Sequence, residues 1–129
     1  MPRRILLVDD DEATLELLGT TLEKNGFEVV KAKDTTQAKW LWEDAREPFD
    51  LLLTDVRLEA EDDGFVLAAR LLESQPNVPV IFISGDEDCF ASPAIQRFGD
   101  SPFLRKPFDL KKMITSVNSI IANRPGSEN

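Results

Sequence analysis

Residues 5–12 read ILLVDDDE, four apolar residues that run directly into Asp9, Asp10, Asp11 and Glu12. The apolar half is typical of a buried β-strand, which more often ends in turn residues than in adjacent carboxylates. Two carboxylates about 4 Å apart repel each other by roughly 4 kcal/mol at an effective dielectric of 20. The end of this strand therefore either lies fully in water or has a partner that offsets the repulsion.

Four more short apolar runs follow along the chain, and segments with helical periodicity separate them. This alternation predicts an α/β fold in which a doubly wound parallel sheet of five strands is connected by five helices. Sheets of this kind bind ligands at the carboxyl ends of their strands, near the point where the strand order reverses. The expected strands are Ile5–Val8, Glu28–Ala32, Leu51–Thr54, Val80–Ser84 and Phe103–Arg105.

The expected helices carry apolar residues at intervals of three and four, which places these residues on one face. Gly26 is expected to end the first helix in the left-handed conformation, and Asp109 to cap the last. Ser92 and Pro93 are expected to begin a short fourth helix, with proline at its first position. The residues predicted to face inward are Leu15, Leu18 and Leu22; Ala38, Leu41, Trp42 and Ala45, with Trp40 outward; Phe65, Ala68, Ala69 and Leu72; and Leu110, Met113, Ile114, Val117 and Ile121.

Length and composition exclude several classes of protein. The 129 residues suit one domain, expected over 1–123, with 124–129 as a flexible tail or the start of a linker. A net charge of -9 argues against direct binding of nucleic acid or of an anionic membrane. With no histidine and a single cysteine, the usual zinc sites are excluded. Since no apolar run could span a bilayer or act as a signal peptide, we expect a soluble, cytoplasmic protein.

The carboxyl ends of the predicted strands carry residues that suit phosphoryl chemistry. Asp55 ends the third strand, Ser84 the fourth, and Lys106 follows the fifth. Carboxylates without imidazole or thiolate favour Mg²⁺, which Asp9 and Asp10 would hold. A hydroxyl and an ammonium group beside such an ion are suited to bind phosphoryl oxygens. Asp55, alone at its strand end, is the better nucleophile.

The segments ILLVDDDE, LLLTDV, VIFISGDED and FLRKPFD, in this order, resemble the receiver domain of bacterial two-component response regulators over roughly residues 4–123. The resemblance implies a flavodoxin-like fold with strand order 2-1-3-4-5. It also implies that Asp55 accepts a phosphoryl group from a histidine kinase or histidine phosphotransfer protein. Asp9, Asp10, Asp55 and the Arg57 carbonyl would hold Mg²⁺, and Ser84 and Lys106 would contact the phosphoryl oxygens.

The resemblance further implies a switch rather than an enzyme with a separate substrate. Ser84 and Phe103 would change state on phosphorylation, and a downstream protein or effector domain would respond. Two departures from the family pattern affect this expectation. Arg57, two residues after the acceptor, could alter the lifetime of the phosphorylated form, and Pro93 puts the usual output surface in doubt.

Two other functions remain open from the sequence. A pseudo-receiver would bind partners without phosphorylation. A phosphatase similar to the haloacid dehalogenases would also use a strand-end aspartate, a serine or threonine, a lysine and Mg²⁺. The phosphatase hypothesis leaves Asp55 unexplained, places Ala13 where threonine or valine is expected, and provides no acidic pair after Lys106.

Overall fold

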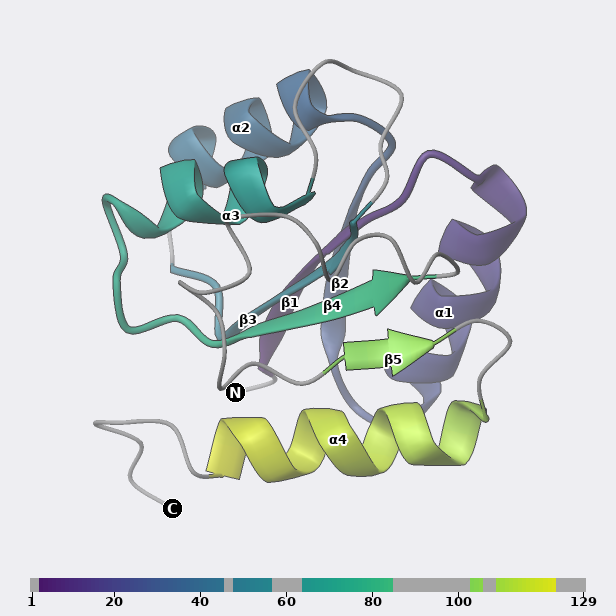
Figure 1. The fold of residues 1–129 in the computed structure, drawn as a ribbon. Helices are drawn as coiled ribbons and strands as arrows, with labels where there is room; N and C mark the ends of the chain where they lie inside the picture. The colour runs from purple at the N-terminus through teal and green to yellow at the C-terminus, as the bar shows by residue number, and fades with distance from the viewer. Residues whose placement is uncertain (1–2, 46–47, 57–63, 85–102, 106–108, 123–129) are drawn as a thin grey trace.

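A computed structural model describes residues 3–45, 48–56, 64–84, 103–105 and 109–122 of the chain, and Figure 1 shows its fold. The short apolar runs form one parallel sheet with strand order β2-β1-β3-β4-β5, as predicted. Its strands are β1 (Arg4–Val8), β2 (Glu28–Ala32), β3 (Leu51–Asp55), β4 (Val80–Ser84) and β5 (Phe103–Arg105).

The strand register is set by side chains that must be buried on both faces of the sheet. β1 and β3 are central, and almost all of their residues are buried, which explains why they read as continuous apolar runs. Val8 is paired with Thr54, and Asp55 with Ile83. The predicted strand bounds hold to within one residue: β1 begins one residue earlier, and β3 continues through Asp55.

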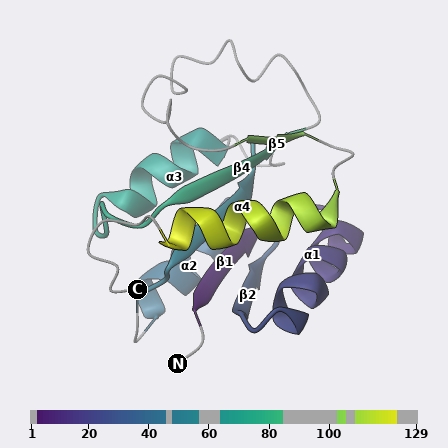
Figure 2. The same ribbon diagram turned by 90° about the horizontal axis from the view of Figure 1, so that it is seen from below.

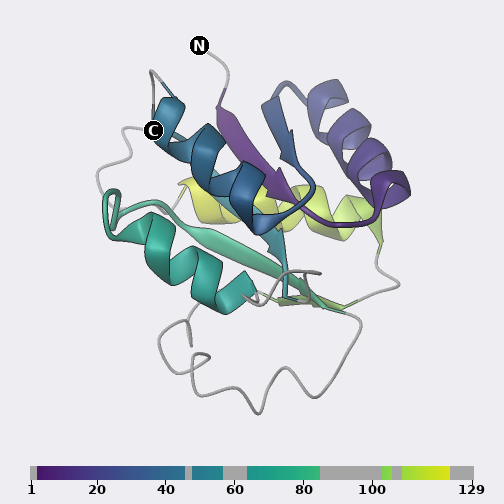
Figure 3. The same cartoon turned by 90° about the horizontal axis from the view of Figure 1, so that it is seen from above.

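Four helices cover the two faces of the sheet within the part of the chain that the structure describes. The helices α1 (Glu12–Lys24) and α4 (Leu110–Ala122) lie on one face (Figure 2), and α2 (Thr35–Asp44) and α3 (Gly64–Leu72) on the other (Figure 3). The helix that we expected to begin at Ser92 and Pro93 lies outside the described residues. None of the described helices is long and apolar enough to cross a membrane.

The core consists of two apolar clusters, one on each side of the sheet. Leu6 and Leu52 face the α2 and α3 layer, whereas Ile5, Leu51 and Leu53 face α1 and α4. Neighbouring residues of one strand thus point into different clusters, as the alternation of a β-strand requires. The sheet lies between the two clusters and contributes residues to both.

Most of the predicted helix faces are confirmed. The inward-facing residues of α1 and α4 are buried or packed against one cluster, and Gly26 follows α1 with φ of 91°. The Asp109 carboxylate accepts a hydrogen bond from the Lys111 backbone N–H at 2.8 Å, as expected of an N-cap. For α3 the prediction was incomplete, because Leu67 and Leu71 are buried as well.

Candidate functional site

The site lies at the carboxyl edge of the sheet, where β1 and β3 end side by side. Because Val8 is paired with Thr54, the residues that follow, Asp9 and Asp55, lie next to each other. Asp9 is 0% exposed and Asp55 is 6% exposed, so both carboxylates are inside the protein surface. Asp10, the next residue after Asp9, is half-buried. The prediction that the parallel sheet brings these side chains together is confirmed.

The three carboxylates are close enough to share one ion. Asp9, Asp10 and Asp55 each offer an oxygen, and these oxygens all lie within 4.8 Å of one another. Three negative charges at this spacing, two of them on buried residues, need compensation. Hard oxygen ligands around a small volume suit Mg²⁺, which is bound in proteins through one or two carboxylates and water. The donor set therefore fits the ion that the sequence predicts.

The turn after β1 fixes the orientation of Asp9. One Asp9 carboxylate oxygen accepts a hydrogen bond from the Asp11 backbone N–H at 2.9 Å. The Asp9 backbone N–H in turn donates to the Ala32 carbonyl oxygen at 3.1 Å, which extends the pairing with β2 by one residue. Asp11 itself precedes α1, and its carboxylate accepts a hydrogen bond from the Thr14 hydroxyl at 2.6 Å. Asp11 is thus the N-cap of α1, whereas Asp9 and Asp10 face the site.

Three hydrogen bonds hold the backbone of Asp55 and of the residue that follows it. The Thr54 hydroxyl donates to the Asp55 carbonyl oxygen at 2.9 Å, although Thr54 is fully buried. The next residue, Val56, donates its N–H to the Ile83 carbonyl oxygen at 2.9 Å and accepts from the Gly64 N–H at 2.7 Å. A side chain at Gly64 would overlap the Asp55 carbonyl oxygen. The start of α3 is therefore packed directly against the backbone of the acidic residue.

Thr54 and Gly64 were not identified as supporting residues from the sequence. A buried threonine in an otherwise apolar strand is a signal for a local hydrogen bond of this type. A glycine at the first position of a helix is a signal for close packing, because glycine has no other advantage there over better helix formers. Neither signal indicates which backbone group will be approached, since that depends on how α3 docks on the sheet.

The other predicted site residues are described only in part. Ser84 is the last residue of β4 and is paired with Arg105, and Phe103 begins β5. The side chains of Ser84 and Phe103 lie outside the described residues, as do Arg57 and Lys106 altogether. The roles of these four residues stay predictions. The register nevertheless places the end of β4 beside β3, since Ile83 is paired with Asp55.

The family of the chain follows from a match to a known domain. Residues 5–118 match the model of the response regulator receiver domain. The chain belongs to the response regulator receiver family. The resemblance inferred from the four segments is thereby confirmed. Response regulators with such domains take part in two-component signalling.

Curated relatives place the domain in proteins of different length. The chain is 34% identical over 120 residues to the transcriptional regulatory protein GlrR of Escherichia coli K12, but it spans only 26% of that protein. It is 34% identical over 123 residues to the response regulator receiver protein CpdR of Brucella abortus, with coverage of 92% of this chain and 97% of CpdR. Receiver domains similar to this chain therefore occur both in long regulators and in a protein of its own size.

Solved structures support the same fold. A receiver domain of an HD domain-containing protein from Pseudomonas fluorescens is 27% identical, with a TM-score of 0.84 and coverage of 95% of this chain and 97% of the other. A CheY-like receiver protein from Methanospirillum hungatei superimposes with a TM-score of 0.87, covering 99% of this chain and 100% of the other at 24% identity. The second likeness shows the fold alone.

Proposed function

We propose that this receiver domain is a phosphorylation-dependent switch in which Asp55 accepts a phosphoryl group. The donor is a phosphohistidine of a histidine kinase or of a histidine phosphotransfer protein. An Asp55 carboxylate oxygen attacks phosphorus, the bond from phosphorus to the imidazole nitrogen breaks, and the donor histidine recovers its neutral form by taking up a proton. The domain acts on no separate substrate and works in the cytoplasm.

The observation that supports this proposal is the convergence of the three carboxylates. Asp55 ends the central strand of a five-stranded sheet, and its oxygen lies within 4.8 Å of those of Asp9 and Asp10. Asp55 is a part of β3 whose backbone is held by Thr54 and packed against Gly64. A nucleophile fixed in this way loses little orientational freedom on reaction. Mg²⁺ bound here would neutralise the charge of the carboxylates and of the incoming phosphoryl oxygens.

The remaining predicted residues would complete the reaction around Asp55. Asp9 and Asp10 would hold Mg²⁺ with the Arg57 carbonyl, and Ser84 and Lys106 would bind the phosphoryl oxygens once they arrive. Ser84 and Phe103 would then change conformation, which shifts the population of the domain toward an active state recognised by a downstream protein or effector domain. Each polar strand end would thus have a role in phosphoryl transfer to Asp55 or in the response to it.

The proposal is tested by intact mass after incubation with acetyl phosphate and Mg²⁺. We expect wild type to gain one phosphoryl group, and to gain none when the divalent cation is removed by a chelator. Asp55→Asn should gain none under any condition, because an amide is not a nucleophile toward phosphorus. Asp34→Asn is the matched control, since it also replaces a carboxylate by an amide but lies at the start of α2, outside the cluster.

Three outcomes would count against the proposal. Phosphorylation of Asp55→Asn to the extent of wild type would place the acceptor elsewhere. Failure of folded wild type to react with acetyl phosphate and with several purified histidine kinases would favour a binding module that works without phosphorylation. Hydrolysis of a small phosphate ester with turnover would instead support the phosphatase alternative.

A further inference from the structure

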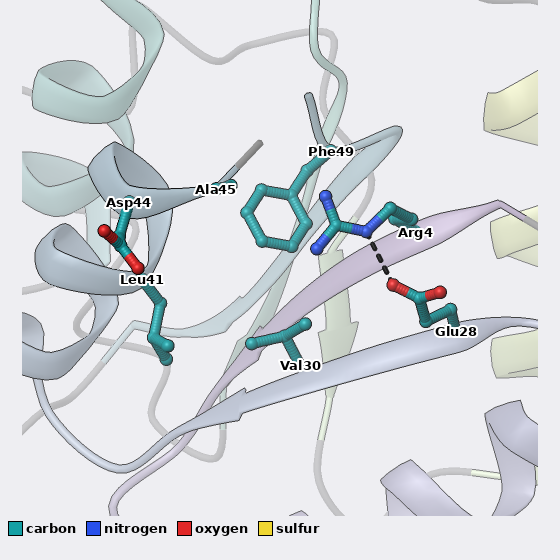
Figure 4. Close-up of a pocket in the computed structure, with 7 residues that line it drawn as sticks. All are labelled: Arg4, Glu28, Val30, Leu41, Asp44, Ala45 and Phe49. Carbon is teal, nitrogen blue, oxygen red and sulfur yellow. Dashed lines mark hydrogen bonds and ion pairs between the residues drawn. The ribbon is translucent and has the colours of Figure 1, made fainter. Parts of the chain in front are cut away.

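A second surface feature lies at the opposite end of the sheet from the carboxylates. A hollow of about 460 Å³ opens between the carboxyl end of α2 and the first residues of β1 and β2. In Figure 4 Leu41, Asp44 and Ala45 form one side of this hollow, and Arg4 and Phe49 form the other. Nothing in the proposed phosphoryl chemistry uses this part of the molecule.

The lining of the hollow is mixed: Arg4, Glu28 and Asp44 are charged, and the other residues that line it are apolar. Val30 lies on β2, which is one of the two edge strands of the sheet, and both Val30 and Leu41 are only partly buried. Phe49 is buried, and its ring is stacked on Trp42 with 5.3 Å between the ring centroids. The lining is therefore rigid on the Phe49 side, and a bound side chain would meet a preformed surface.

An exposed tryptophan flanks the same end of α2. Trp40 is 62% exposed, and among the described residues only it and Leu17 are large apolar side chains with such exposure. Trp40 lies four residues before Asp44, so these two side chains are neighbours on the helix surface. Tryptophan is enriched among the residues that dominate binding energy at protein interfaces. Because Asp44 also lines the hollow, we treat Trp40 and the hollow as one surface, which we call the α2 edge surface.

The charge of this surface selects a basic partner. The last turn of α2 carries Glu43 and Asp44 and contains no basic residue, so both carboxylates add to the negative end of the helix dipole. Arg4 lines the same hollow, where its Nε donates to Glu28 at 2.6 Å and its guanidinium lies over the Phe49 ring at 4.6 Å. Among the described residues no ion pair is formed by Asp44.

We propose that the α2 edge surface docks a partner segment in which an arginine or lysine lies beside an aromatic or aliphatic side chain. The apolar side chain enters the hollow over Val30, Leu41 and Phe49. The cationic group lies between Asp44 and the face of Trp40, where a carboxylate and an aromatic ring both favour it. A second copy of this chain is a poor occupant, because each copy carries a net charge of -9.

The test is a selection of random twelve-residue peptides on the immobilised full chain, followed by affinity measurements with the enriched peptides. We expect the enriched sequences to combine arginine or lysine with aromatic or aliphatic residues. Trp40→Ala and Asp44→Lys should each weaken binding by about tenfold or more. Both variants should fold, since Trp40 is exposed and a lysine at the carboxyl end of α2 improves the interaction with the helix dipole.

Matched controls separate this surface from general attraction to an acidic protein. Leu17→Ala removes the other exposed large apolar side chain, and Glu23→Lys makes the same charge change on α1. Both controls should bind the peptides as wild type does. The proposal is overturned if no peptide is enriched, if the enriched peptides are acidic or uncharged, or if Trp40→Ala and Asp44→Lys leave affinity unchanged. Self-association of wild type that Trp40→Ala abolishes would also overturn it, in favour of a homodimer.

Discussion

Gly19 and Gly64 are both buried, but a methyl group added by an alanine substitution would contact different atoms at the two positions. At Gly64 it would overlap the Asp55 carbonyl oxygen and approach the Val56 backbone, neither of which can move without shifting β3. We expect Gly64→Ala to lower the free energy of unfolding by about 1–3 kcal/mol, the usual cost of overpacking, and to slow phosphorylation by acetyl phosphate. Urea unfolding and intact mass measure the two effects.

Gly19→Ala provides the comparison for Gly64→Ala. The added methyl group would meet only the end of the Lys31 side chain, which can rotate away into solvent. This rotation would break the exposed ion pair between Lys31 Nζ and Glu16 Oε1, which are 3.2 Å apart. An exposed ion pair of this kind contributes little to stability. Since alanine is favoured over glycine inside a helix by roughly 0.5–1 kcal/mol, Gly19→Ala should be neutral or stabilising. A large loss of stability in Gly19→Ala would mean that the two sites do not differ as described.

The repulsion among the three carboxylates should be measurable in the absence of metal. Asp10 is the most accessible of the three, and its replacement by asparagine removes one charge from a group of oxygens that lie within 4.8 Å of one another. Two charges at such a distance repel by roughly 3 kcal/mol at an effective dielectric of 20, and solvent around Asp10 reduces this value. We expect Asp10→Asn to raise the metal-free melting temperature and to reduce the stabilisation by Mg²⁺, as followed by calorimetry. An unchanged response to Mg²⁺ would place the ion elsewhere.

At the scale of elements, the start of α2 depends on a reciprocal pair of hydrogen bonds. The Asp34 carboxylate accepts from the Gln37 backbone N–H at 2.7 Å, and the Gln37 side chain accepts from the Lys33 backbone N–H at 2.8 Å. Asp34→Ala should lower the free energy of unfolding by about 1 kcal/mol, whereas Asp34→Asn keeps an acceptor and should cost little. Equal losses for the two variants in urea unfolding would show that charge, rather than the hydrogen bond, stabilises this helix start.

The sequence predicts best those elements whose residue pattern fits only one type of secondary structure. Each strand is a short apolar run between turn residues, and the bounds of β2, β4 and β5 are as predicted. The three carboxylates could be placed together because parallel strands end at one edge. For α3 the periodicity fails, since GFVLAARLL is apolar around most of the helix and cannot show which residues are buried. The contact of Gly64 with Asp55 is tertiary, and no local pattern encodes it.

At the scale of the whole molecule, the sheet separates two apolar clusters that must nevertheless unfold together. Trp42 reports on the α2 and α3 side, where its indole N–H donates to the Ser74 hydroxyl at 3.1 Å and its ring is stacked on Phe49. Met113 is fully buried on the opposite side, in the α1 and α4 cluster. Leu52 and Leu53 are adjacent in β3 but belong to different clusters, so loss of either cluster exposes one face of the same strand.

Because of this coupling, we expect a cavity in the α1 and α4 cluster to lower the stability of the α2 and α3 cluster as well. In a Trp40→Phe background, where Trp42 is the remaining tryptophan, Met113→Ala should lower the free energy of unfolding by about 2–5 kcal/mol. Trp42 fluorescence and far-ultraviolet circular dichroism should give the same, lower urea midpoint, because a small domain with one shared sheet unfolds in a single transition. A fluorescence midpoint that stays at the value of the Trp40→Phe parent while the dichroism midpoint falls would show that the two layers unfold separately. In that case a change in the stability of the α1 and α4 layer would not alter the stability of the α2 and α3 layer.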